Sequence, residues 1–156
     1  VANYNSPTQV VITGETKPVQ RATQLAEARG AKRTIPLNVA GPWHSMLMND
    51  ARETFSADLD AAEIHDPEIP VYANIDAAPK ATGEEVREAL KEQITSPVRW
   101  AQTVLELRKE FPNMPFIECG PGRVLKGLMR GIDKAAVCVN VECPKSLDAC
   151  LEKLRG

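Results

Sequence analysis

The chain has 156 residues, of which 43% are hydrophobic and 26% are charged, and its formal net charge is −2. These proportions are typical of a globular domain that is long enough to build a substantial core. The slight negative charge and the aromatic content of 4% give no basis for binding nucleic acid or an anionic membrane surface. No run of about 18 apolar residues occurs, so we expect no membrane-spanning segment.

The first forty residues have the pattern of an incomplete split β-α-β unit. Strands are predicted over Val1–Asn5 and Gln9–Thr13, a helix over Lys17–Arg29 and a further strand over Arg33–Ala40. Such a unit normally begins with one more strand and helix. We therefore interpret residues 1–40 as the remnant of a ferredoxin-like small subdomain.

The rest of the chain alternates between helices and strands. Helices are predicted over Met46–Ala62, Gly83–Ile94, Pro97–Phe111, Val124–Ile132 and from Ser146 onward, and strands over Val71–Ile75, Pro115–Cys119 and Ala136–Val141. Ser96 is the predicted N-cap of the third helix, with Pro97 at its first position. The alternation predicts an α/β fold in which residues 41–156 form part of a mostly parallel sheet with flanking helices.

The four cysteines do not form a metal-binding pattern. Cys119, Cys138, Cys143 and Cys150 include no C-x-x-C pair, and both histidines are distant from them in the sequence. A zinc site is therefore not expected. We interpret these residues as free thiols in a reducing compartment, the cytoplasm.

His44 is the main candidate for a chemical role. It follows the turn Gly41–Trp43, where an apolar stretch meets the next predicted helix, and such positions favour functional sites. An imidazole can take up and return a proton near neutral pH. A structural role for His44 is the plainer alternative, because no nucleophile is evident: Ser45 is a predicted N-cap, and no G-x-S-x-G motif occurs. His65 is interpreted as a surface loop residue.

Two further features have a plain and a functional interpretation. The segment Gly120–Arg123 between a strand and a helix is either a tight turn or, with Lys126, a cradle for a phosphate. Asn3 and Asn5 alternate on the first strand and so share one face, which is either exposed or lines a cleft.

Several collinear motifs carry a resemblance to a known family. They are Ala2–Gly14, Gly30–Arg33 leading into Pro36–Met48, Pro70–Ile75, Gln93–Trp100 and Phe116–Leu125. Together they resemble the malonyl-CoA:acyl-carrier-protein transacylases of fatty acid synthesis. The resemblance covers nearly the whole chain and corresponds to the C-terminal half of that family's enzyme.

The resemblance implies a ping-pong transfer of a malonyl group from coenzyme A to the thiol of acyl carrier protein, through an acyl-enzyme on a serine. His44 matches the family's general base and acid, and Gln93 matches the residue whose backbone carbonyl orients the imidazole. Asn5 and Asn3 match the polar lining of the acyl cleft. Trp43 resembles the aromatic residue that selects malonyl groups, although most relatives have Phe there.

The resemblance also implies that parts of the machinery precede Val1. The family's serine elbow, the arginine that pairs with the malonyl carboxylate and the oxyanion-hole glutamine match no residue of this chain. We therefore expect the N-terminal half of the same enzyme as a partner, besides malonyl-CoA and acyl carrier protein, and no bound cofactor. The isolated chain is expected to be inactive and poorly folded.

Two other functions remain open from the sequence. The first is a non-catalytic module that docks acyl carrier protein or a synthase partner through basic residues. Candidate docking residues are Lys32, Arg33, Arg123, Lys126 and Arg130. The second is a nucleotide-binding fold that uses the turn at Gly120.

Overall fold

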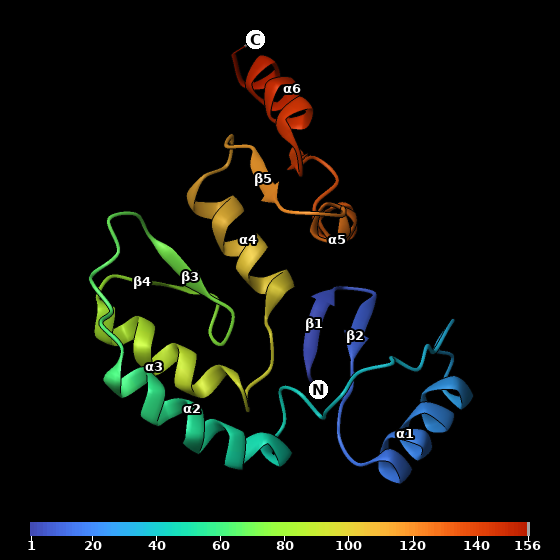
Figure 1. The fold of residues 1–156 in the computed structure, drawn as a ribbon. Coiled ribbons are helices and arrows are strands. Elements are labelled where there is room, and N and C mark those ends of the chain that lie inside the picture. The colour runs from blue at the N-terminus through green and yellow to red at the C-terminus, as the bar shows by residue number, and fades with distance from the viewer. Residues whose placement is uncertain (156) are drawn as a thin grey trace.

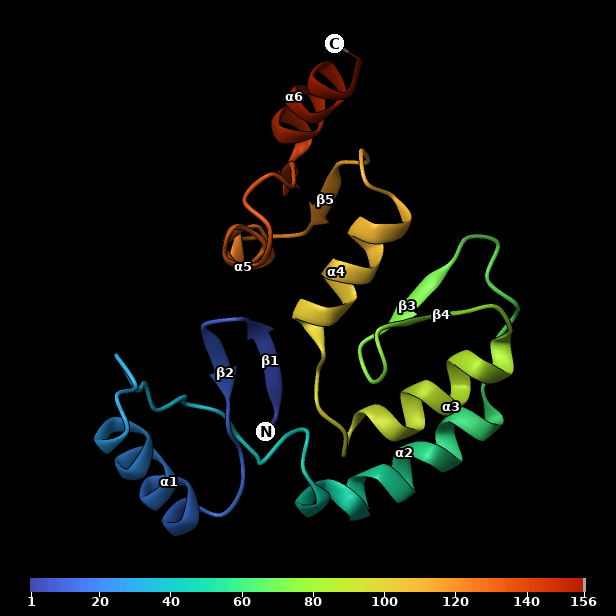
Figure 2. The same cartoon turned by 180° about the vertical axis from the view of Figure 1, so that it is seen from behind.

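The computed structural model describes residues 1–155, which form six α-helices and three two-stranded sheets (Figures 1 and 2). The helices are α1 (Thr16–Ala28), α2 (Asn49–Ala61), α3 (Gly83–Gln93), α4 (Trp100–Glu110), α5 (Val124–Ile132) and α6 (Pro144–Arg155), with the short 3-10 helix η1 (Met46–Met48) before α2. The strands are β1 (Asn3–Ser6), β2 (Gln9–Val11), β3 (Val71–Ala73), β4 (Ala78–Lys80), β5 (Phe116–Cys119) and β6 (Cys138–Val141). The predicted α/β character is confirmed. None of the helices in this part of the chain is long and apolar enough to cross a bilayer.

The three sheets differ in the direction of their strands. β1 and β2 form the predicted antiparallel hairpin, in which Asn3 lies opposite Val11. β5 and β6 are parallel, with Phe116 opposite Cys138. β3 and β4 form a second antiparallel hairpin. The sequence did not predict β4, because its central residue is Pro79, which has no N–H to donate to a ladder.

The predicted strand over Arg33–Ala40 is wrong. The segment has no hydrogen-bonded partner strand among the residues described, and its alternating apolar side chains face solvent. Ile35, Leu37 and Val39 are 58%, 57% and 60% exposed. The period-2 pattern is present, but the chain supplies no neighbouring strand or layer to cover it.

The predicted start of α4 is also wrong, because the helix begins at Trp100 and not at Pro97. The backbone of Val98 bonds to β1 instead: its N–H donates to the Ala2 carbonyl at 2.8 Å, and its carbonyl accepts from the Tyr4 N–H at 2.9 Å. This pairing holds the chain extended where the local capping signal favoured a helix. Ser96 is consequently not the N-cap.

An unusually large part of the apolar surface of the chain is exposed to solvent. Its accessible area is 11004 Å², whereas a compact protein of this mass exposes about 7,800 Å². Among residues 1–155 only six apolar side chains are buried, including Leu59, Val104 and Met129. α1 makes at most marginal contact with the other elements and lies at one end of the open arrangement (Figure 1).

The α2–α3 pair is the best-defined helical unit. Thr82 and Glu85 form a capping box at the start of α3, and the Asp66 carboxylate accepts the Gly83 N–H at 2.7 Å. Gly83 is buried, and a Cβ added there would lie 2.2 Å from the carbonyl oxygen of Ile64. Only glycine allows the 64–66 segment to cross the helix start this closely.

Gly83→Ala is therefore expected to destabilise the protein by about 2–3 kcal/mol, because the added methyl group meets backbone atoms that have no room to move aside. Denaturant unfolding followed by circular dichroism measures this loss. The matched control is Gly127→Ala in α5, where a Cβ meets no atom within 4 Å; it should be neutral or stabilising by up to about 1 kcal/mol. Equal stability of the two variants would contradict the prediction.

Candidate active site

His44 lies in the loop that enters η1, in an uncommon backbone conformation. Its φ is +60°, in the left-handed region that residues other than glycine seldom adopt. Its N–H donates to the carbonyl of Ile94 at 3.1 Å, just after the end of α3. Strained backbone of this kind persists where surrounding contacts hold it, and it concentrates at functional sites.

The imidazole of His44 is held by a second carbonyl of the same turn. Nδ1 lies 3.0 Å from the backbone oxygen of Gln93. A carbonyl oxygen only accepts, so Nδ1 must carry the hydrogen and Nε2 keeps its lone pair in the neutral ring. No side chain or backbone group of residues 1–155 bonds to Nε2. The half-buried ring thus presents an oriented proton acceptor.

The connection between α3 and α4 joins His44 to two other parts of the fold. Gln93 and Ile94 hold the histidine, Val98 bonds to β1, and the N–H of Arg99 donates to the carbonyl of Asn74 at 2.8 Å. Figures 1 and 2 show the N-terminal end of β1, the loop before α2 and this connection meeting at one place. Sequence reasoning missed Ile94 and Val98, because backbone bonding leaves no signature in side-chain type.

Ser45 is an N-cap, as predicted, and its hydroxyl is fully used within the loop. Its Oγ accepts the N–H of Leu47 at 3.3 Å and donates to the carbonyl of Pro42 at 2.6 Å. On the other side of the histidine, the Trp43 side chain lies against Gly41 and is 49% exposed. The residue that precedes His44 is therefore a bulky, exposed aromatic group.

Asn3 and Asn5 lie on β1 and are both half-buried, and the pairing with β2 shifts register between Tyr4 and Ser6. The bonds between β1 and Val98 bring this strand to the same connection that holds His44. Neither amide side chain makes a hydrogen bond within residues 1–155, and neither bonds to the histidine. Their amides could therefore bind another group, and no hydrogen bond within the described residues links them to the imidazole.

The turn at Gly120 is filled by carboxylates of the chain itself. Gly120 and Gly122 have φ values of +128° and +89°, which favour glycine. The Glu118 carboxylate accepts the N–H groups of Leu125 and Lys126 at 2.9 and 3.0 Å, at the start of α5. Glu142 accepts the N–H of Gly122 at 3.1 Å. Since these donors already bind negative groups, the phosphate-cradle interpretation is not supported.

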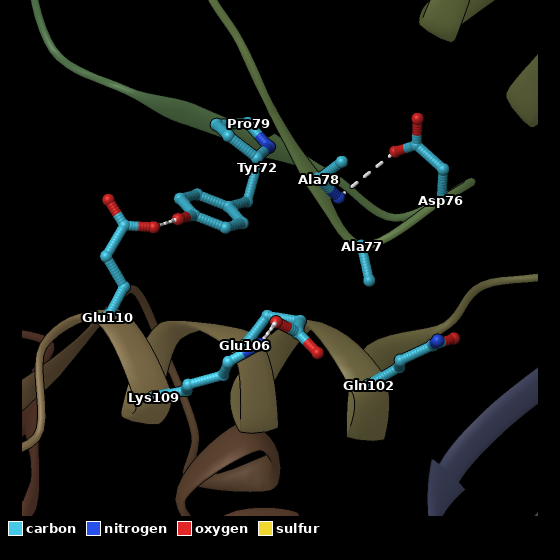
Figure 3. Close-up of a pocket in the computed structure, with 9 residues that line it drawn as sticks. All are labelled: Tyr72, Asp76, Ala77, Ala78, Pro79, Gln102, Glu106, Lys109 and Glu110. Atoms are coloured by element: carbon cyan, nitrogen blue, oxygen red, sulfur yellow. Dashed lines mark hydrogen bonds and ion pairs between the residues drawn. The ribbon is translucent and has the colours of Figure 1, made fainter.

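A cavity lies away from His44, between the β3–β4 hairpin and α4 (Figure 3). Its volume is 520 Å³, and it is lined by Tyr72, Asp76, Ala77, Ala78, Pro79, Gln102, Glu106, Lys109 and Glu110. The Tyr72 hydroxyl donates to the Glu110 carboxylate, and this bond raises the pKa of Tyr72 to about 12. Three of the four charged side chains of this cavity are acidic, and none is paired with His44. We assign the candidate site to the histidine and not to the cavity.

The other titratable and thiol groups supply no competing site. His65 is highly exposed and lies 3.4 Å from Glu63, in agreement with its interpretation as a surface residue. All four cysteines are free. Within residues 1–155 no cluster of His, Cys, Asp and Glu side chains has the arrangement of a metal site.

Comparison with known proteins identifies the class. The family model for the acyl transferase domain matches residues 1–142. The chain therefore belongs to the acyl transferase domain family. The malonyl CoA-acyl carrier protein transacylase of Bacillus subtilis is 39% identical over 155 residues, which are 99% of this chain and 49% of the relative.

Solved structures agree with this match. The malonyl CoA-acyl carrier protein transacylase of Coxiella burnetii has a TM-score of 0.95 at 32% identity, over 99% of this chain and 49% of the other. A malonyl-transacylase in complex with its type II PKS acyl-carrier protein has a TM-score of 0.92 at 40% identity, over 97% of this chain and 49% of the other. The chain thus spans about half the length of the relatives it matches.

Glu118→Ala is expected to lower stability by about 1–2 kcal/mol, because two N–H groups at the start of α5 lose their charged acceptor. Denaturant unfolding of the full-length encoded protein measures the change. Glu68→Ala, which removes an exposed loop carboxylate, serves as the control and should have almost no effect. If the two variants unfold alike, the carboxylate does not stabilise the helix.

Proposed function

We propose that this chain supplies the general base and part of the acyl cleft of an acyltransferase that moves a malonyl group from coenzyme A to acyl carrier protein. The family assignment supports acyl transfer, and the transacylase relatives support malonyl-CoA and acyl carrier protein as substrates. The serine nucleophile belongs, in this proposal, to a part of the enzyme outside the 156 residues of the chain.

The observation that carries the proposal is the hydrogen bond between His44 Nδ1 and the Gln93 carbonyl. It fixes the tautomer whose Nε2 accepts a proton, and it fixes the direction in which Nε2 faces. A carbonyl performs this orienting task without the full negative charge of an aspartate. His44 is accordingly assigned as the catalytic residue and Gln93 as its positioning partner.

The reaction proceeds in two matched halves. His44 Nε2 takes the proton of the serine hydroxyl as its oxygen attacks the malonyl thioester carbonyl, and the tetrahedral intermediate expels coenzyme A, whose sulfur receives that proton. The phosphopantetheine thiol of acyl carrier protein then gives its proton to Nε2 and attacks the serine ester. The serine oxygen leaves and recovers the proton, so the enzyme is regenerated.

The assignment of the cleft residues is supported by the bonds that bring β1 to the connection holding His44. Asn5 and Asn3, half-buried on β1 with no side-chain hydrogen bond among the residues described, are assigned to the polar lining that binds the acyl group. Trp43, exposed beside His44, is assigned to the wall that limits the substituent on the malonyl α-carbon. A ring of this size leaves little room for an α-methyl branch.

The missing layers of the fold are part of the same proposal. A two-stranded parallel sheet is not stable alone, and parallel sheets are normally covered on both faces. We assign β5–β6, with residues 41–156, to a larger mostly parallel sheet that other strands of the enzyme complete. Residues 1–40 are assigned to a ferredoxin-like small subdomain, whose other parts would cover the exposed side chains of Ile35, Leu37 and Val39. β1 connects the two parts through Val98.

The proposal needs no resident cofactor, because acyl transfer between thiols requires only the base, the nucleophile and oxyanion donors. Its partners are malonyl-CoA, acyl carrier protein and the N-terminal half of the enzyme. The four free cysteines suit a cytoplasmic location.

A docking module without catalytic activity is the alternative. Arg130 on α5 and Arg123, the N-cap of α5, are exposed, as are Lys32 and Arg33 after α1, whereas Lys126 is half-buried. The complex of a related transacylase with its carrier makes such a role chemically reasonable for basic residues. The docking alternative would give the oriented imidazole no chemical role.

The decisive experiment is His44→Ala in the full-length encoded protein. Loss of the general base should reduce the rate of malonyl transfer by roughly a hundredfold or more, measured with labelled malonyl-CoA and acyl carrier protein. His65→Ala is the matched control, because it removes the other histidine of these 156 residues from an exposed position, and it should leave the rate unchanged. Unchanged turnover in the first variant, with altered carrier binding, would favour the docking alternative.

A further inference from the structure

The side chain of Gln93 closes the turn whose backbone holds the histidine. Its carbonyl accepts from His44 Nδ1 at 3.0 Å and from the Ser96 N–H at 3.3 Å. In the opposite direction, its side-chain Nε2 donates to the carbonyl of Ser96 at 3.1 Å. Gln93 and Ser96 are therefore joined by two bonds that run in opposite senses.

This closure matters because α3 ends at Gln93. The last carbonyls of a helix have no donor within the helix, so the helix itself does not determine where they point. A terminal turn that lacks other contacts frays. In this protein the amide of Gln93 ties down the turn that carries its own carbonyl, and that carbonyl sets the direction of the imidazole.

We propose that the side-chain amide of Gln93 is a positioning group for His44, acting through the Ser96 carbonyl to hold the Gln93 backbone oxygen against Nδ1. The proposal rests on the proposed function and deepens it, because a misplaced Nε2 would slow the proton transfer of that reaction. Gln93 contacts the histidine only through its backbone oxygen, and the proposal gives its side-chain amide a role in that contact.

A neighbouring bond in the same turn provides a matched control. The hydroxyl of Thr95 donates to the carbonyl of Glu92 at 3.3 Å, and Thr95 is buried. That carbonyl does not contact His44. Thr95→Val therefore removes a hydrogen bond of the same turn, at a buried site, without touching the carbonyl that orients the imidazole.

The experiment compares Gln93→Met with Thr95→Val in the full-length encoded protein. Methionine keeps the length of the glutamine but has no donor. We expect Gln93→Met to lower kcat about tenfold with KM for malonyl-CoA changed less than about twofold, because small displacements of a catalytic group cost rate more than binding. In ¹⁵N NMR spectra at a pH where the ring is neutral, His44 should change from one tautomer to a mixture. Thr95→Val should leave kcat and the tautomer unchanged.

Each outcome decides the proposal. If Gln93→Met keeps the single tautomer and a kcat within twofold of the parent, the amide is only a structural brace and the proposal fails. If Thr95→Val lowers kcat and mixes the tautomers equally, the effect belongs to the turn in general and the proposal fails. If Gln93→Met mixes the tautomers while His44→Ala leaves malonyl transfer unchanged, the positioning role stands and the proposed function is the part that fails.

Discussion

The rest of the structure depends on the backbone of the short connection between α3 and α4. Two carbonyls at the end of α3 and the start of the connection accept hydrogen bonds from His44. The N–H and the carbonyl of Val98 both bond to the segment of β1, and the N–H of Arg99 donates to Asn74 in the β3–β4 hairpin. Three segments far apart in the sequence are thereby held at one place. On the side of the connection every one of these bonds uses a backbone atom, so the conformation of the connection determines whether they form.

The openness of the chain follows from the same organisation. His44 and β1 are each held to the α3–α4 connection by hydrogen bonds. Few large apolar side chains are buried, and Leu37 and Ile117 are exposed. The chain spans half the length of its relatives and matches half of one relative's structure at a TM-score of 0.95. In the proposed function the base is oriented within this chain and the nucleophile belongs to another part of the enzyme.

Carboxylate side chains accept backbone N–H groups at the starts of two helices of this fold. Glu85 and Asp66 bond to N–H groups around the start of α3, and Glu118 does so at the start of α5. The bonds from the backbone of Ala81 and Thr82 lower the pKa of Glu85. The same arrangement explains why a glycine-rich turn before α5 is not an anion site, since an acidic side chain of the chain already compensates the positive end of the helix.

By itself, the sequence determined the features that depend on residues close to one another along the chain. Period and capping signals located the helices within a few residues, and α5 matches its predicted bounds of Val124–Ile132 in full. The collinear motifs pointed to the family and singled out His44. Tertiary structure alone decided that Val98 pairs with β1 and so delays α4, that the stretch before His44 stays unpaired, and that the imidazole bonds to a carbonyl 49 residues away. Backbone groups are the same in every residue, so only the folded chain determines which of them meet.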